Sequence, residues 1–249
     1  MRIHCISTGA VRLKRGQRGA RRYLAGGWRE RTLPVNVFAV EHPEGTCVFD
    51  TGQTAHAASA RYFPRWYPFF RLARFELGPE DEAAPKLQEL GVDPGAVRWV
   101  VLSHLHTDHV GGLAGFPGAD VLVSRREWDR ARGLGGRLRG YLPQHWPAGL
   151  TPRLVEFPAA PLGPFASSLD LAGDGRLLLV PTPGHTPGHM ALIVHTGDRS
   201  YLLGGDLCGS RAELPKAAPE IARFCAEGDV LLLATHDPDA AAMVASSRP

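Results

Sequence analysis

The feature that most constrains the fold is the stretch of residues 103–112, which reads Ser-His-Leu-His-Thr-Asp-His-Val-Gly-Gly and follows the apolar run 97–102. Imidazole nitrogens and carboxylate oxygens are the atoms that bind zinc and similar hydrolytic metals in proteins. Four such side chains are more than one tetrahedral ion takes from a single loop if substrate must also reach it. The stretch therefore predicts two metal ions side by side, which share the side chains of His104, His106, Asp108 and His109.

The same arrangement, an apolar run that leads to a metal-binding type of residue, occurs at four other places. Runs 46–49, 177–180, 200–203 and 230–233 lead to Asp50, His185, Asp206 and His236 respectively. Short apolar runs indicate buried strands, and the sites of α/β proteins collect at one edge of a sheet. We therefore expect an α/β fold in which five strand ends deliver histidine and aspartate to one site.

Local signals predict the remaining elements. Further strands are expected at 3–11, 33–40 and 121–123, and helices at 85–90, 125–132, 219–227 and 238–246. Ser124 and Glu127 have the spacing of a capping box at the start of a helix. Asp237 is expected to cap the last helix. Residues 133–152 are rich in glycine and proline, which predicts a long connection.

Length, charge and cysteine usage exclude several classes of protein. The 249 residues are enough for one large core, and we expect a single domain over residues 1–249. No apolar run reaches the roughly 18 residues needed to cross a membrane, and the first residues lack the pattern of a signal peptide. We therefore expect a cytoplasmic protein with no membrane partner. The four cysteines form no CxxC pair, which predicts free buried thiols, and a net charge of +3 is too small to indicate a nucleic-acid partner.

Two segments allow more than one interpretation. Residues 12–31 hold eight basic side chains against Glu30 alone, which fits a solvated arm or, alternatively, a patch for a polyanion or an acidic substrate. Residues 61–77 hold seven aromatic side chains between arginines. That segment fits a loop packed on the core or a subunit contact in a homodimer or, alternatively, an apolar wall over a substrate.

Taken together, the metal-binding types of residue resemble those of the metallo-β-lactamase superfamily. The His104-x-His106-x-Asp108-His109 motif and the residues His185, Asp206 and His236 follow that superfamily's order and spacing. Residues 50–52 and 182–189 match as well, and the resemblance covers the chain from its first strand to its end. It implies the superfamily's fold, a four-layer αβ/βα sandwich.

The resemblance also implies a role for each residue. A first metal would be bound by His104, His106 and His185, a second by Asp108, His109 and His236, and Asp206 would bridge them. The cofactors would be two divalent ions, zinc in the first place and iron, manganese or cobalt otherwise. A hydroxide that bridges them would attack a carbonyl or phosphoryl centre. The catalytic residues would then be His104, His106, Asp108 and His109, and Asp108 would also transfer the proton. Asp50 and His189 would orient the metal ligands.

Within the superfamily, residues 90–94, 103–112 and 235–238, together with the helix that contains Glu127, are most similar to the N-acyl homoserine lactonase-like group. This similarity implies a hydrolase that acts on small lactones or carboxylic esters with an apolar portion. One departure concerns Gly209, because such lactonases have at this position a tyrosine that contacts the lactone carbonyl. The hydroxyl would have to come from elsewhere, with Tyr67, Tyr141 and Ser210 as candidates.

Three other functions are compatible with parts of the sequence. A phosphoester hydrolase, for organophosphate triesters or nucleic acid, would use the same metal site, and the basic segment 12–31 would support it. A mononuclear-iron persulfide dioxygenase of the same superfamily would need fewer ligands than the chain offers. A non-enzymatic binding module is disfavoured because the ligand series is complete.

Overall fold

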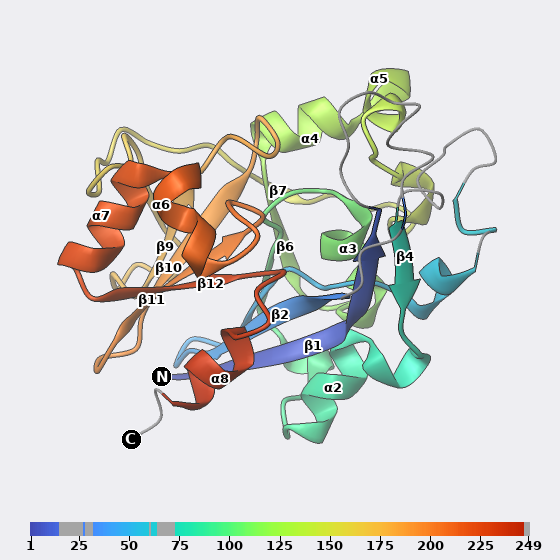
Figure 1. Ribbon diagram of the computed structural model, residues 1–249, viewed down its shortest axis with the longest axis horizontal. Helices are drawn as coiled ribbons and strands as arrows, with labels where there is room; N and C mark the ends of the chain where they lie inside the picture. The colour runs from blue at the N-terminus through green and yellow to red at the C-terminus, as the bar shows by residue number, and fades with distance from the viewer. Residues whose placement is uncertain (15–26, 28–31, 60, 64–72, 247–249) are drawn as a thin grey trace.

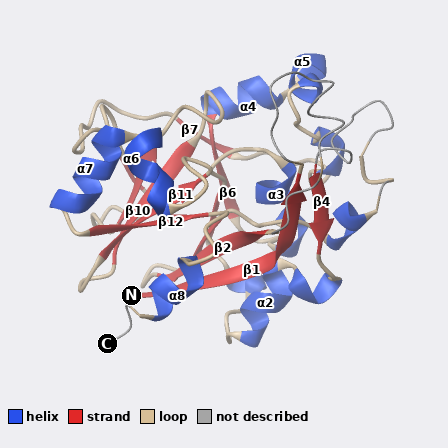
Figure 2. Ribbon diagram, viewed as in Figure 1, coloured by secondary structure: helices blue, strands red, loops and turns tan. Residues whose placement is uncertain are grey.

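The computed structural model describes residues 1–14, 27, 32–59, 61–63 and 73–246. Two β-sheets face each other at its centre, and helices lie on their outer sides (Figure 1; Figure 2). In the described part of the chain the first sheet has the strand order β4-β1-β2-β3-β5-β6-β7. Its strands are β1 (Arg2–Leu13), β2 (Leu33–Glu41), β3 (Cys47–Phe49), β4 (Ala73–Glu76), β5 (Trp99–Val101), β6 (Asp120–Ser124) and β7 (Arg153–Val155).

The second sheet has the strand order β12-β11-β10-β9-β8. Its strands are β8 (Leu169–Asp170), β9 (Leu177–Pro181), β10 (Met190–His195), β11 (Ser200–Gly205) and β12 (Val230–Ala234). The helices are α2 (Ala83–Glu89), α3 (Thr107–Val110), α4 (Arg125–Ala131), α5 (Gly133–Leu138), α6 (Leu214–Ala217), α7 (Pro219–Glu227) and α8 (Ala240–Ala245).

Alternation of side chains along the strands produces the layers. In β10, Met190, Leu192 and Val194 point into the core between the two sheets. Ala191 and Ile193, on the other face, join a second core with Leu214 of α6 and Cys225 of α7. The outer face of the first sheet packs in the same way on α2 and α4. The predicted four-layer αβ/βα sandwich is therefore confirmed.

Most elements lie where the sequence predicts them, and the exceptions have physical reasons. β10 was not predicted; both of its faces are buried, and it is an apolar run of the same kind as β9, β11 and β12. The connection 133–152 contains α5, although glycine opens it. Asp237 does not cap α8, because Asp239 precedes that helix. The carboxylate of Asp237 instead accepts hydrogen bonds from the backbone N–H groups of Asp239 and Arg211.

The two ambiguous segments are described only in part. Of residues 12–31, the structure describes 12–14 and 27, and Arg12 pairs with Glu76 on β4 at 3.1 Å. Of the aromatic residues in 61–77, those described are Tyr62, Phe63 and Phe75, and they pack in a buried cluster. These three side chains are core; the rest of both segments lies outside the described residues.

All four cysteines are free, as predicted. No helix among the described residues is both long and apolar enough to cross a bilayer.

Candidate metal centre

The side chains predicted to bind metal come from strand ends at one edge of the paired sheets. β3 and β5 are parallel in the first sheet, and β9, β11 and β12 run in one direction in the second. Backbone hydrogen bonds tie the two edges together, from Met190 N to Ser103 O at 3.0 Å and from Asn36 N to Thr235 O at 2.9 Å. The loops that follow these strands therefore meet in one place.

Three imidazoles form a first cluster. Nδ1 of His106 lies 3.0 Å from Nε2 of His104 and 3.0 Å from Nε2 of His185. His104 and His106 follow β5, and His185 follows β9. The cluster runs from the fully buried His104 to His185, whose side chain is 37% exposed. Solvent therefore reaches the cluster from the side of His185.

A second cluster is formed by Asp108 and His109 of α3 together with His236, which follows β12. Nε2 of His236 is 3.6 Å from Oδ2 of Asp108. Nδ1 of His236 lies 2.8 Å from the carbonyl oxygen of Pro34, to which it can only donate. The proton of the neutral ring is thus on Nδ1, and Nε2 is left with a free lone pair.

Asp206 lies between the two clusters. Its Oδ1 is 3.4 Å from Nε2 of His109 and 3.4 Å from Nε2 of His236. Its Oδ2 is 3.4 Å from Nε2 of His185. One oxygen of the carboxylate faces each cluster, which is the placement that a bridging ligand needs.

The spacing of these atoms fits bound metal ions. At metal–ligand distances of about 2.0–2.1 Å, two ligands of a tetrahedral ion lie about 3.3 Å apart, and the separations above run from 3.0 to 3.6 Å. Nε2 of His109 and Oδ1 of Asp206 are also buried without a hydrogen-bond partner in the described structure. Such atoms are costly to bury, and an ion between them would remove the cost.

Asp50 and Ser103 fix the rings from the other side. The Asp50 carboxylate accepts hydrogen bonds from Nδ1 of His109 at 2.8 Å, from Ser103 N at 2.7 Å and from Ser103 Oγ at 2.8 Å. Ser103 Oγ in turn lies 3.0 Å from Nδ1 of His104. Asp50 therefore has the contacts expected of a residue that orients a metal ligand and the loop backbone.

His189 has the orienting position that the sequence analysis expects. Its Nε2 accepts a hydrogen bond from Asp206 N at 3.1 Å, so Nδ1 carries the proton toward Thr182 Oγ1, 2.7 Å away. Burial lowers the pKa of His189 to about 3, which keeps the ring neutral. The approach requires glycine at position 205: its φ is +51°, and a Cβ there would lie 2.8 Å from Nε2 of His189.

Glu127 is a further residue of the site that the sequence analysis missed. The predicted capping box is only half right: Ser124 Oγ accepts from Glu127 N, but the Glu127 carboxylate points elsewhere. It is fully buried and accepts from Leu105 N at 3.1 Å and from Thr186 Oγ1 at 2.7 Å. It therefore joins the loop of His104 and His106 to the loop of His185.

Burial and mutual charge set the protonation of the rings. Burial, with the neighbouring imidazoles, lowers the pKa of His104 well below its ordinary value and that of His106 to about 4. Burial also lowers the pKa of His109, but the carboxylates of Asp206 and Asp50 outweigh it and raise this pKa well above the ordinary value. His104 and His106 are therefore neutral, the form of imidazole that binds metal.

Tyr67, Tyr141 and Ser210 are the candidates for the hydroxyl that a tyrosine at position 209 would supply, and they differ in their surroundings. Tyr67 lies outside the described residues. Tyr141 is buried against the ring of His106, and its hydroxyl is engaged with Glu127, so it is not free to contact substrate. Ser210 is partly exposed. A Cβ on Gly209 would lie 3.0 Å from Oε2 of Glu213, so the space beside Gly209 is taken by that carboxylate.

Tyr62 brings another hydroxyl close to the second cluster. Its oxygen lies 3.0 Å from Thr107 Oγ1, next to Asp108 in the chain. Its ring stacks on His145 with 3.8 Å between centroids, and His145 Nε2 lies 2.7 Å from the Tyr62 carbonyl oxygen. His145 thus reaches the neighbourhood of the site through Tyr62 and does not contact the clusters itself.

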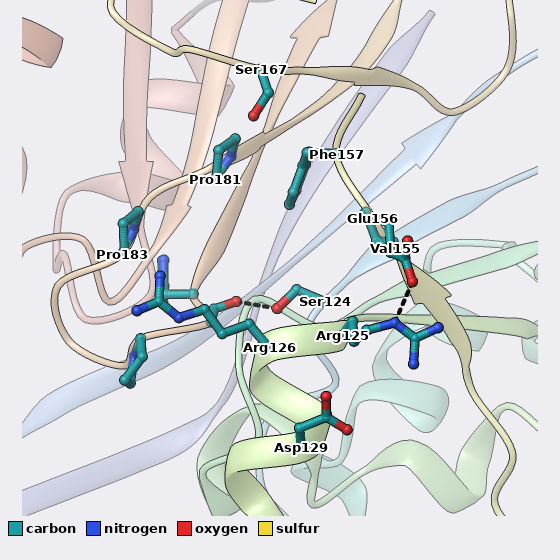
Figure 3. Close-up of a pocket in the computed structure, with 13 residues that line it drawn as sticks. Ser124, Arg125, Arg126, Asp129, Val155, Glu156, Phe157, Ser167, Pro181 and Pro183 are labelled. Carbon is teal, nitrogen blue, oxygen red and sulfur yellow. Dashed lines mark hydrogen bonds and ion pairs between the residues drawn. The ribbon is translucent and has the colours of Figure 1, made fainter. Parts of the chain in front are cut away.

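A hollow of about 540 Å³ lies beside the loop that carries His185 (Figure 3). Arg126, Phe157 and Pro183 line it. Its contact with the metal centre is through His189, whose ring is 1% exposed and has both nitrogens engaged. The hollow therefore ends behind the metal-binding atoms.

Comparison with known proteins agrees with this geometry. The sequence profile described as Metallo-beta-lactamase superfamily matches residues 31–242, which include every residue of both clusters. The chain belongs to the metallo-beta-lactamase superfamily. It is accordingly an enzyme, a metal-dependent hydrolase.

Relatives within the superfamily include lactonases. N-acyl homoserine lactonase AttM of Rhizobium radiobacter is 29% identical over 238 residues, which cover 86% of each protein. A probable metallo-hydrolase of Mycobacterium tuberculosis is 41% identical over 193 residues, covering 73% of this chain and 59% of that protein.

Among solved structures, N-acyl homoserine lactone hydrolase with N-hexanoyl-L-homoserine at its catalytic metal centre superposes with a TM-score of 0.75. It is 21% identical, and the match covers 99% of this chain and 96% of that one. The dizinc quorum-quenching lactonase AidC superposes with a TM-score of 0.62 at 17% identity, over 95% and 87% of the two chains. At these identities the likeness shows the superfamily's fold.

Proposed function

We propose that this metallo-hydrolase binds two divalent metal ions and hydrolyses lactones or carboxylic esters. The observation that carries the proposal is the position of Asp206, whose two oxygens face two separate clusters of metal-binding atoms. The lactonase AttM, aligned over most of both chains, supports lactones as the substrate class.

We assign one ion to His104, His106 and His185, the other to Asp108, His109 and His236, and the bridge to Asp206. Zinc fits a site of imidazoles and carboxylates, and iron, manganese and cobalt accept the same donors. Ions held there would supply a Lewis acid for the substrate carbonyl and a water of lowered pKa as nucleophile.

The chain's own residues prepare the site for that chemistry. Asp50 and the Pro34 carbonyl hold protons on Nδ1 of His109 and His236, so that Nε2 of each ring faces Asp206. Glu127 holds the loop of His104 and His106 through Leu105 N, and His189 holds the backbone of Asp206. Asp108, with 14% of its side chain exposed, is the carboxylate that we assign to proton transfer, because it lies at the cluster and reaches solvent.

The proposal is tested by metal analysis coupled to a substrate panel. Metal-loaded wild type is expected to hold two ions per chain and to hydrolyse members of a panel of lactones and aryl esters at neutral pH. His106→Ala and Asp206→Ala are expected to lose bound metal and hydrolysis. His195→Ala is the matched control, because its Nδ1 pairs with Ser200 Oγ away from the clusters.

Failure of metal-loaded wild type on the whole panel would refute the lactone and ester assignment. One iron per chain in place of two ions would refute the dinuclear assignment. The phosphoester alternative is not favoured, because the relatives that cover most of this chain include N-acyl homoserine lactonase AttM.

A further inference from the structure

The helix α5 carries two leucines that are turned to solvent. Leu134 is 79% exposed and Leu138 is 75% exposed; the next large apolar side chain among the described residues, Leu90, is 47% exposed. Residues four apart lie on the same face of a helix, so Leu134 and Leu138 form one apolar patch. Single exposed apolar side chains are ordinary, whereas neighbouring ones with a charged rim make a candidate interaction site.

The rim of this patch is basic. Four arginines lie in α5 or beside it, and all of them are exposed: Arg130, Arg132, Arg137 and Arg139. In the part of the chain that the structure describes, none of the four pairs with a carboxylate, whereas Arg125 of α4 pairs with Glu156. Over residues 128–140 the one acidic side chain is Asp129, so four arginines against one aspartate leave a net charge of +3. The two leucines and the four arginines are called the α5 patch below.

The α5 patch lies at the periphery of the molecule but is attached to the wall of the metal centre. The backbone N–H of Tyr141, three residues after the helix ends, donates to the carbonyl oxygen of Gly136 at 3.3 Å. The Tyr141 ring lies 5.2 Å from the ring of His106 between centroids. Figure 1 shows α5 beside α4, at the opposite end of the molecule from α2. The α5 patch is therefore an outer surface with a fixed position relative to the metal centre.

Charge decides which partner fits the α5 patch. In a dimer with two-fold symmetry the same surface meets itself, so the four arginines of one copy would face the four of the other. Like charges brought together in this way oppose such a contact. An anionic lipid bilayer complements both parts of the patch, because it offers phosphate groups to the guanidinium ions and hydrocarbon just beneath them to the leucines.

We propose that α5 docks this enzyme on the surface of an anionic lipid bilayer, with Leu134 and Leu138 inserted at the headgroup boundary and the four arginines on lipid phosphates. Apolar side chains beside basic ones are the pattern of segments that lie in the membrane interface. The expectation of no membrane partner concerns a spanning segment, and a peripheral contact needs none. The contact goes beyond the proposed function, since no step of the hydrolysis depends on it.

Vesicle flotation with the metal-loaded protein tests the proposal. Vesicles of phosphatidylcholine that contain about 30% phosphatidylglycerol supply the anionic surface, and vesicles of phosphatidylcholine alone are the comparison. The protein is expected to bind the anionic vesicles only, and more weakly as added salt screens the arginines. Absence of binding to the anionic vesicles at low salt would overturn the proposal.

Substitution of the leucines separates insertion from adsorption by charge. Leu134→Ser combined with Leu138→Ser leaves the core intact, because both side chains are exposed. The vesicle partition coefficient should fall by about tenfold or more for each leucine, and Arg137→Gln should lower it by about fivefold. Leu90→Ser is the matched control, because Leu90 is an exposed leucine at the end of α2, and it should bind as wild type. Wild-type binding by the double serine variant would refute insertion of α5.

A fluorescent label measures the insertion directly. The native thiols are buried or partly buried, so an environment-sensitive dye can be attached to Leu138→Cys and, as the control, to Leu90→Cys. Emission should shift to the blue on anionic vesicles for the first variant only; a dye at position 138 that stays in water on bound vesicles would contradict the proposal. Light scattering tests the other occupant: a wild-type dimer that the double serine variant converts to a monomer would assign the α5 patch to a second copy of the chain instead.

Discussion

The Asp50 carboxylate accepts a hydrogen bond from Nδ1 of His109 at 2.8 Å, and this contact decides which ring nitrogen points into the site. Because Nδ1 carries the proton, Nε2 is the nitrogen left beside Asp206. Asp50 holds this position with a left-handed backbone, at φ +59°. Aspartate and asparagine adopt that conformation more readily than most residues.

Asp50→Asn is expected to weaken metal binding by about 10- to 100-fold, as for other residues that orient a metal ligand. Aspartate offers two acceptor oxygens for Ser103 and His109, whereas asparagine offers one and places an N–H group against donors. Asparagine tolerates the same backbone, so the substitution isolates the hydrogen bonds. Competition with a chromogenic chelator measures the affinity; wild-type affinity in the variant would contradict the role given to Asp50.

Glu127→Gln is expected to destabilise the fold by about 1–3 kcal/mol, because one buried donor, on Leu105 or Thr186, would lose its acceptor. It should also weaken metal binding, since Glu127 joins the loops of the first cluster. Denaturant unfolding and chelator competition give the two values. Glu156→Gln is the control, because Glu156 makes an exposed ion pair with Arg125 of a kind that contributes about 0–1 kcal/mol. Equal stability of the two variants would refute the role of Glu127.

Metal removal is expected to lower thermal stability. A ligand that binds only the folded state adds about 2.7 kcal/mol at a free concentration of one hundred times Kd. For a chain of this size that corresponds to about 5–10 °C in Tm. Differential scanning calorimetry before and after chelation, and again after zinc is restored, measures the change. A Tm that does not respond to metal would contradict the metal centre, and His106→Ala should reduce the response.

The four thiols are expected to resist alkylation in the folded protein at pH 8 and to react fully in guanidinium chloride. The thiolate is the reactive form, and burial raises the pKa of Cys47 to about 12 and that of Cys208 to about 11 from the ordinary value of 9.0. Burial does the same for Cys5 and Cys225, to about 12 and about 11. Mass spectrometry counts the modified sites. Rapid labelling of any one thiol in the native state would contradict this.

The same pKa shifts predict how stability changes at alkaline pH. Unfolding returns each thiol to its ordinary pKa of 9.0, so above that pH the unfolded state loses protons that the folded state keeps. The free energy of unfolding should therefore fall as the pH rises above 9. Near pH 7 the titration of these thiols should add no pH dependence to it. Denaturant unfolding of wild type and Cys47→Ala across this range tests the sign, because the variant should lose less stability with rising pH.

Strands and metal-binding side chains were predictable because their signals are local. An apolar run followed by histidine or aspartate is visible in the residues themselves, and the parallel direction of successive strands brings such ends to one edge. The clusters around His106 and His236 therefore contain the residues that the sequence analysis expects.

The contacts of the Glu127 carboxylate are not determined by spacing along the chain. By itself the sequence determined the strand ends, the ligand series and the start of α4 at Ser124, since each depends on neighbours at fixed separations along the chain. Only the tertiary structure decided that the Glu127 carboxylate binds Leu105 and Thr186, and that the ring of Tyr62 stacks on that of His145. A buried carboxylate bonds to whichever donors the fold brings to it, and rings stack where distant segments of the chain meet, so neither contact depends on local spacing.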